Sequence, residues 1–193
     1  EEVLPQPVRA KALDLVAGTG TSGTCADGTL ATSCNVDPSD VYADRLGQVY
    51  FLERGRVRAI DSSNRVYTVM GSGLSSGDGQ LATQARIGAI ADLKLWSNAG
   101  TPTVVISDQG DLRIREFAID GTIQNIAGNG SHGSALTTQP ATSQPISYNG
   151  RGVVDQIRFQ VDATTGTVYG SSRDVNYLSR LDRATGRWVD FVG

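Results

Sequence analysis

The stretch GDGQLAT at residues 77–83 nearly repeats an earlier stretch, ADGTLAT, at residues 26–32. The flanking residues repeat as well, because LVAGTG (15–20) precedes the first copy and TVMGSG (68–73) precedes the second. Neither copy holds an obvious catalytic group. The chain therefore contains a repeated unit that is larger than one loop.

A third, degenerate copy of the loop sets the length of this unit. It starts at NIAGNG (125–130) and runs into LTTQPAT (136–142), which keeps the Ala-Thr pair and loses the Asp-Gly pair. The glycines that close the apolar segments, at 18, 71, 128 and 193, are separated by 53, 57 and 65 residues. Internal similarity at a period of roughly 40–50 residues is typical of propeller blades and of helical repeats.

The segments between the loops alternate apolar and polar residues, which indicates strands rather than helices. In DQIRFQVD (155–162) the apolar residues are every second one. GQVYFLE, TPTVVISD and GTVYGSS are rich in β-branched and aromatic residues and are bounded by Gly, Pro and Asp. Residues 56–71, 112–128 and 177–193 each predict strand, turn and strand, because DSSN, DG and DRATG accept turn geometry. Each repeat therefore predicts four antiparallel strands.

A four-stranded antiparallel meander of this length is typical of a β-propeller blade. The stretch ISDQGDLRIREFAIDGTIQNIAGNG (106–130), with SGDGQLATQARI (76–87) before it, resembles the NHL repeat of extracellular and bacterial β-propeller proteins. The resemblance extends from Lys11 onward and is weakest in the third repeat, where SQPISYNGRGV inserts extra residues. We predict an all-β fold of NHL-type blades, about three of them in this chain.

The predicted division has an N-terminal extension at residues 1–10 and propeller blades at 11–193. Residues 11–18 are expected to form strand d of an incomplete blade, followed by blades at 19–71, 72–128 and 129–193. Propellers close with about 4 to 8 blades, so three blades leave two open faces. Open faces and unpaired edges favour association. We expect further blades in a longer chain, which the stop within the repeat element favours, or homo-oligomerisation into a six-bladed ring or a fibre tip.

The copied loop is expected to connect the outer strand of one blade to the inner strand of the next, with glycines that permit positive φ. Asp27 and Asp78 are predicted to hydrogen-bond the backbone of their own turns. The alternative, a calcium site, would need several more oxygen ligands at close spacing.

Cys25 and Cys34 both lie in the first copy of the loop, and the second copy manages without them. We predict a disulfide, which would stabilise the fold by about 2–3 kcal/mol and favours an extracellular, cell-surface or periplasmic location. Free thiols in a reducing compartment are the alternative, while a zinc site would lack its further Cys or His ligands. The sequence has no apolar run of 18 residues, so we expect no membrane insertion.

Recognition is expected on the face of the propeller where the long connections emerge. In a meander the b-to-c and d-to-a connections share one face, which we call the long-loop face. It gathers the three copied loops with ERGR (53–56), SDQGD (107–111) and SRDVNY (172–177). Loops on a rigid scaffold often carry binding residues. The candidate binding residues are Arg54, Asp108, Arg173, Asp174 and Tyr177, and the alternative for each is an ordinary solvated or inter-blade contact.

An enzymatic role is weighed against the histidine content. Some relatives with this propeller look like lyases, notably the amidating lyase that acts on peptidyl hydroxyglycine, and that chemistry uses a metal in the channel held by several histidines. This chain has one histidine, His132, in the loop NGSHGS, where we expect it on the surface. No Ser or Cys has a local nucleophile signature. We expect no catalytic residue, metal or cofactor; the alternative is a metal-dependent lyase or hydrolase whose other blades supply the active site.

The charge of the chain bears on whether it binds nucleic acid. Some intracellular NHL propellers bind RNA, which takes a dense positive patch. Here 17 Lys and Arg stand against 20 Asp and Glu, a formal net charge of −3, so no nucleic-acid partner is expected. The sequence therefore predicts a secreted or cell-surface recognition or adhesion module that binds a protein or a glycan.

Overall fold

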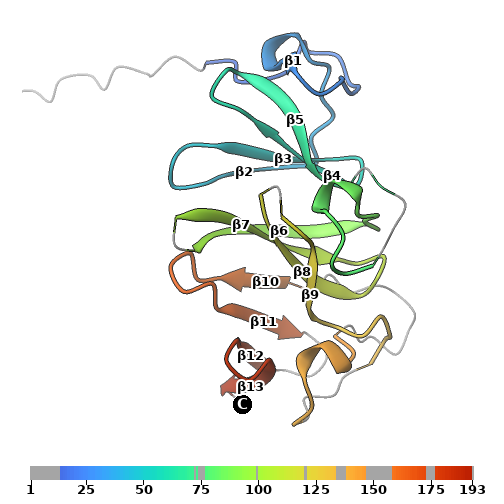
Figure 1. Cartoon of the computed structure of the whole chain (residues 1–193), viewed down its shortest axis with the longest axis vertical. Helices are drawn as coiled ribbons and strands as arrows, with labels where there is room; N and C mark the ends of the chain where they lie inside the picture. The colour runs from blue at the N-terminus through green and yellow to red at the C-terminus, as the bar shows by residue number, and fades with distance from the viewer. Residues whose placement is uncertain are drawn as a thin grey trace, which may run out of the picture.

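The computed structural model describes residues 14–71, 73, 77–98, 100–119, 121–133, 138–146, 158–172 and 177–192. Across these residues the chain forms three antiparallel sheets, which follow one another in sequence order and stack side by side (Figure 1). No helix in this part of the chain is long and apolar enough to cross a membrane.

The first sheet has the order β1-β5-β4-β3-β2 and contains β1 (Thr29–Leu30), β2 (Asp40–Ala43), β3 (Val49–Glu53), β4 (Arg56–Ile60) and β5 (Arg65–Met70). The second sheet contains, in order, β6 (Ile90–Asn98), β7 (Thr101–Asp108), β8 (Arg113–Ala118) and β9 (Gln124–Ala127). The third contains β10 (Arg158–Val161), β11 (Val168–Ser172), β12 (Tyr177–Asp182) and β13 (Arg187–Val192). Three short 3-10 helices lie in the copied loops: η1 (Ala31–Ser33) between β1 and β2, η2 (Ala82–Gln84) between β5 and β6, and η3 (Ala141–Ser143) between β9 and β10.

The sheets are arranged as successive blades of a propeller. Each holds a four-stranded antiparallel meander, and neighbouring sheets meet through their first strands, since β2 lies near β6 and β6 near β10. Strand a is the innermost strand of a propeller blade, which accounts for this contact. The predicted all-β fold of antiparallel blades is confirmed, and the described sheets form an open array.

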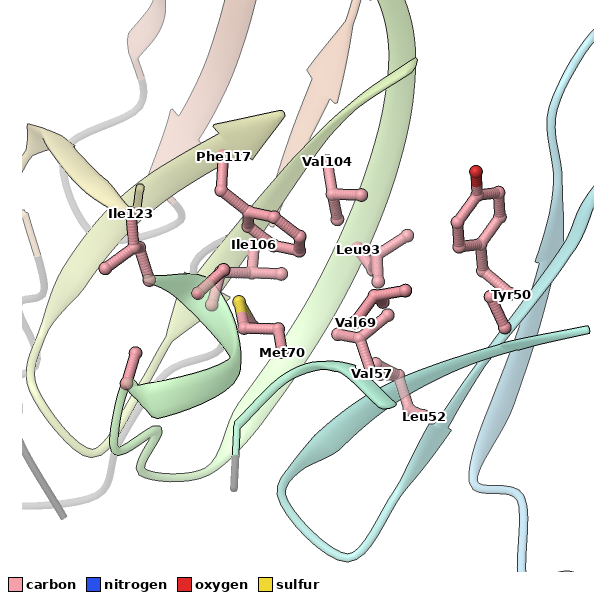
Figure 2. Close-up of a cluster of buried hydrophobic side chains, with 13 residues drawn as sticks. Tyr50, Leu52, Val57, Val69, Met70, Leu93, Val104, Ile106, Phe117 and Ile123 are labelled. Atoms are coloured by element: carbon pink, nitrogen blue, oxygen red, sulfur yellow. The ribbon is translucent and has the colours of Figure 1, made fainter. Parts of the chain in front are cut away.

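Strand alternation places two separate cores between the sheets. On β7, Val104 and Ile106 face the first sheet, whereas Val105 faces the third. The first core joins Leu52 and Val57 of the first sheet to these residues (Figure 2), and the second lies between the second and third sheets. Burying one such side chain contributes about 1.5–3 kcal/mol, so the apolar residues on both faces of β7 account for the stacking.

The three copies of the loop fold in the same way. The glycine that closes each apolar segment donates its N–H to the carbonyl of a buried alanine at the start of the 3-10 helix: Gly18 to Ala31 (2.9 Å), Gly71 to Ala82 (3.1 Å) and Gly128 to Ala141 (3.0 Å). The N–H of each alanine donates in turn to the c-to-d turn of the following sheet: to Asn64 (2.8 Å), Gly121 (3.0 Å) and Gly186 (2.8 Å). Each loop is thereby held against the outer edge of the next blade.

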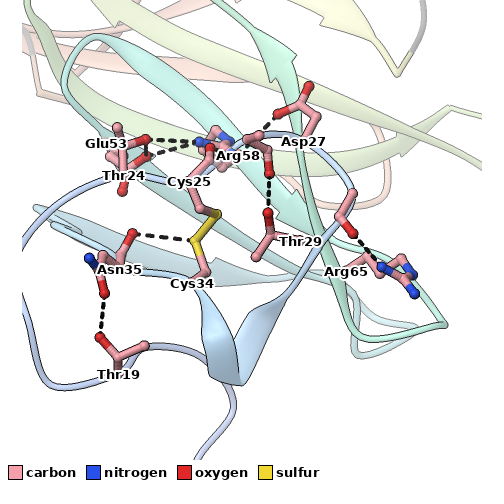
Figure 3. Close-up of a disulfide and its surroundings, with 12 residues drawn as sticks. Thr19, Thr24, Cys25, Asp27, Thr29, Cys34, Asn35, Glu53, Arg58 and Arg65 are labelled. Atoms are coloured by element: carbon pink, nitrogen blue, oxygen red, sulfur yellow. Dashed lines mark hydrogen bonds and ion pairs between the residues drawn. A yellow bond between two sulfur atoms is a disulfide. The ribbon is translucent and has the colours of Figure 1, made fainter.

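The predicted disulfide between Cys25 and Cys34 is confirmed, with a Cα–Cα distance of 5.3 Å (Figure 3). Cys34 is fully buried and holds the position of Ala85 in the second copy, which is also buried. It packs with Phe51 and Val66 against the outer face of the first sheet. Disulfides persist in oxidising environments, so this bond indicates an oxidising compartment.

The predicted blade boundaries, at 11–18, 19–71, 72–128 and 129–193, stay a prediction. Of the segment expected as an isolated outer strand, residues 14–18 lie outside the strands, and residues 11–13 lie outside the described residues. The outer face of the third sheet exposes Leu178 and Val189. Exposed apolar side chains of this kind are what an open blade face would present.

Candidate functional site

A buried arginine of the first sheet binds the first copied loop. Arg58 in β4 is fully buried, and its guanidinium donates to Glu53 (3.0 Å), to Asp27 (3.1 Å) and to the carbonyl of Cys25 (3.2 Å) (Figure 3). Asp27 also accepts a hydrogen bond from the hydroxyl of Thr68 (3.0 Å). The prediction that Asp27 serves its own turn is therefore wrong. Its carboxylate instead balances a buried charge, which would be costly to leave unpaired.

The second sheet repeats this cluster. Arg115 in β8 is fully buried and lies 3.1 Å from Asp78, 3.6 Å from Asp108 and 3.9 Å from Asp111. Asp78 thus has the same role as Asp27, and the prediction of a local turn bond is wrong for it too. Burial raises the pKa of Asp108, and the nearby charge of Asp111 raises it further.

The third sheet has other residues at the positions of this cluster. The pairing of strands c and d shifts register between Val57 and Arg58, between Ile114 and Arg115, and between Leu178 and Ser179. Ser179 therefore holds the position of the two buried arginines. Ser172 is the last residue of β11, just as Glu53 is the last residue of β3 and Asp108 the last residue of β7. Since the third loop copy also lacks the Asp-Gly pair, the arginine and its carboxylate partners are lost together.

A cleft of about 380 Å³ opens on the long-loop face between the first and second sheets. Its walls come from the ends of two copied loops and from the turn that joins β3 to β4. The lining residues are Asp37, Pro38, Ser39, Leu52, Arg54, Gly55, Gly88, Ala89 and Ile90.

The two buried clusters hold the backbone of this cleft. Glu53 accepts a hydrogen bond from the N–H of Asp37 (3.1 Å), and Asp108 accepts one from the N–H of Gly88 (3.2 Å). Each carboxylate also lies beside the buried arginine of its own sheet. The wall on either side is thereby fixed before any ligand arrives, which reduces the ordering cost of binding.

An exposed ion pair lies at the cleft. Arg54 donates from Nε (3.3 Å) and Nη2 (3.2 Å) to a single oxygen, Oδ2, of Asp37, and the two side chains are 55% and 48% exposed. Arg54 has a φ of 48° and Gly55 a φ of 76°, the two positive values of a type I′ hairpin turn. A residue as bulky as arginine is uncommon in this conformation. Its presence there is not explained by the needs of the turn.

The structure places the predicted site residues in different settings. Arg54 lines the cleft, whereas Asp108 is buried behind the cleft wall, where it holds Gly88. Arg173 and Asp174 lie outside the described residues, and Tyr177 begins β12 with a side chain that is not among those described. The structure thus places Arg54 at the cleft and Asp108 behind its opposite wall.

Sequence reasoning missed Asp37. A signal was present, because alignment of the loop copies on Ala31 and Ala82 sets Asp37 opposite Gly88. The repeat therefore does not need a carboxylate at this position. The same comparison singled out the two cysteines.

The inner strands carry a second polar cluster. The hydroxyl of Tyr42 donates to Asp40 (2.6 Å), and Lys94 forms an ion pair with Asp92. Burial and the hydrogen bond to Asp40 raise the pKa of Tyr42. His132 is exposed, as predicted. Across the described residues, no three His, Cys, Asp or Glu side chains gather in a way that could hold a metal ion.

Comparisons with known proteins give structural similarity alone. No family model matches the chain, and no curated protein matches it. A protein of Bacteroides thetaiotaomicron, provisionally named a phosphatase, is similar over 78% of this chain and 36% of its own, with a TM-score of 0.49 and 14% identity. A streptogramin B lyase is similar over 80% of this chain and 40% of its own, with a TM-score of 0.41 and 11% identity.

The chain spans less than half the length of either of these solved structures. Its assignment to the propeller architecture rests on the described strand order and on the contacts between first strands. The chain has a propeller-like all-β fold, with a cleft between its first two blades.

Proposed function

We propose that this chain is a non-catalytic recognition module of the NHL propeller type, which binds a protein or glycan ligand through the cleft at Arg54. The observation that carries the proposal is the exposed Arg54–Asp37 pair at a cleft whose walls are fixed by buried charges. We further propose that the module acts outside the cytoplasm, at a cell surface, in the periplasm or as a secreted protein. The disulfide supports this location.

The dimensions and chemistry of the cleft support a binding role. Ligand sites usually enclose about 300–1,000 Å³ and combine apolar walls with a few polar groups that fix orientation. This cleft of about 380 Å³ has apolar walls at Leu52 and Ile90 and one charged pair at its edge. The pair is exposed, so it contributes little to stability and remains accessible to a ligand.

The open sheets support a second kind of partner. We propose that the outer face of the third sheet contacts either further blades of a longer chain or another copy of this chain. Leu178 and Val189 are exposed there, whereas Leu181 on the opposite face of the third sheet packs into the second core. Covering them would remove apolar surface from water.

Binding arrays test the proposal. The wild-type protein and the Arg54→Ala and Arg187→Ala variants would be applied to arrays of glycans and extracellular proteins. Arg187 is exposed in β13, away from the cleft, and is the matched control. We expect specific ligands that Arg54→Ala loses and Arg187→Ala keeps, with unchanged circular dichroism for both. Ligands retained equally by the two variants would contradict the proposed site.

A further inference from the structure

We propose that the occupant of the cleft is a neutral sugar ring that presents two adjacent hydroxyl groups, and thus a glycan rather than a protein segment. This inference rests on the proposed function and specifies its ligand. It follows from which hydrogen-bonding groups the cleft offers, how its charges balance and what its walls are made of.

Three backbone N–H groups at the cleft already donate to acceptors of the protein and cannot hydrogen-bond a peptide ligand. The N–H of Asp37 is bound to Glu53 and that of Gly88 to Asp108, while the N–H of Ser39 donates to the carbonyl of Leu52 (2.9 Å). A peptide that adds to a sheet edge relies on exchange of main-chain hydrogen bonds. These three donors are already engaged, so we assign the recognition to the side chains of the cleft.

The charged side chains of the cleft are one donor and one acceptor, and the hydroxyl of Ser39, a further polar group of the lining, donates to the carbonyl of Leu52 (3.4 Å). Arginine only donates and a carboxylate only accepts. Among the described residues, both donors that Arg54 directs at Asp37 reach Oδ2, and Oδ1 of Asp37 accepts no hydrogen bond. A hydroxyl group can donate and accept, so of two adjacent hydroxyls one can donate to Asp37 while its neighbour accepts from Arg54. Both contacts would be charge-assisted and therefore strong.

Charge balance favours a neutral ligand. Arg54 and Asp37 cancel each other at the cleft, and the whole chain has a formal net charge of −3. An acidic sugar would compete with Asp37 for the guanidinium, and a basic side chain would compete with Arg54 for the carboxylate. A diol bridges the two without separating them.

The walls suit the apolar face of a sugar ring. Leu52, Pro38 and Ile90 offer aliphatic surface for its C–H groups. Gly55 and Gly88 lie close together, since a Cβ on Gly55 would be 3.6 Å from the carbonyl oxygen of Gly88. The absence of a side chain at Gly55 keeps this part of the wall free of a Cβ, so that a ring can approach the backbone.

Titrations with simple sugars test the inference. Methyl glucopyranoside, mannopyranoside and galactopyranoside would be followed by saturation-transfer NMR, together with their 2,3-dideoxy analogues and methyl glucuronide. We expect at least one neutral hexoside to bind. Loss of the diol, or the substitution Asp37→Ala or Arg54→Ala, should weaken its binding about tenfold or more. Asp37→Asn should retain part of the affinity, because an amide oxygen still accepts.

Controls and opposing outcomes separate this inference from the proposed function. Asp14→Ala and Arg187→Ala remove exposed charges outside the cleft and should leave sugar binding unchanged. Methyl glucuronide that binds more tightly than the neutral hexosides, or hexoside binding indifferent to Asp37→Ala, would overturn the inference. Protein ligands lost with Arg54→Ala, with no hexoside bound, would overturn it while leaving the recognition role intact. If no ligand of any class depends on Arg54, both proposals fail.

Discussion

Replacing Arg115 by methionine would remove the positive charge from the second buried cluster while keeping most of the volume of the side-chain stem. Asp108 would then be a buried carboxylate without its guanidinium, 3.6 Å away in the native protein. Breaking a buried ion pair from one side typically costs about 3–5 kcal/mol. We expect Arg115→Met to lower the free energy of unfolding by about this amount, because Asp78 and Asp111 lose the same partner.

A double-mutant cycle in urea isolates the pair. Adding Asp108→Asn to Arg115→Met should recover part of the loss, with a coupling energy within about 0.5–3 kcal/mol. The pH dependence is a second readout. Arg115 lowers the pKa of Asp108, which burial raises above its ordinary value of 3.8, so the substitution should raise this pKa further. Because its pKa is raised, Asp108 binds a proton more readily in the folded than in the unfolded protein. The free energy of unfolding therefore gains from this protonation as pH falls from the folded-state pKa toward 3.8.

The cost of Arg115→Met should therefore shrink as pH falls through the Asp108 pKa, since the neutral acid no longer needs a cation. Additive effects of the two substitutions, or a cost of Arg115→Met that does not change with pH, would refute this account of the cluster. Arg187→Met, at an exposed position, is the control and should change the free energy of unfolding by less than about 0.5 kcal/mol.

Three further predictions concern backbone contact, the disulfide and assembly. Gly88→Ala should cost about 1–3 kcal/mol in urea unfolding, because a Cβ there would lie 2.5 Å from the Cα of Gly110. An unchanged midpoint would show that the backbone segments at Gly88 and Gly110 can move apart. Reducing the Cys25–Cys34 bond should cost about 2–3 kcal/mol, and a melting curve insensitive to reductant would argue against this. Light scattering should give a mass above 20.3 kDa, whereas a cooperative monomer would contradict the expected association.

The strands and the disulfide were within reach of the sequence because their signals are local or repeated. The β-branched residues of TPTVVISD, bounded by Pro and Asp, predict β7, whose bounds in the structure are Thr101–Asp108. Comparison of loop copies singled out Cys25 and Cys34 as residues that the repeat does not need. Both kinds of evidence depend on short segments compared with one another, which a sequence displays directly.

The charge clusters were beyond local reasoning. Asp27 binds an arginine 31 positions away and Asp78 one 37 positions away, so turn propensity assigned both to the wrong partner. Asp108 ends β7, and alternation does not say whether a terminal side chain faces solvent or the wall of a cleft. A sequence signal did exist, because the third repeat loses the arginine and the aspartate together. Such a joint loss is what residues in contact would show, and the contacts of Arg58 and Arg115 account for it.

Ser172 and Ser179, at the cluster positions of the third repeat, imply that the third blade opens more easily than the other two. In the first two blades a buried arginine ties the loop to the sheet by charge, in addition to the backbone bond. In the third blade Ser179 replaces the arginine, and among the described residues the backbone bond from Ala141 to Gly186 remains. Proteins open in cooperative segments whose free energies differ. The third blade should therefore exchange its amide hydrogens first. A partner bound to its outer face would slow this exchange and stabilise the blade that opens most easily.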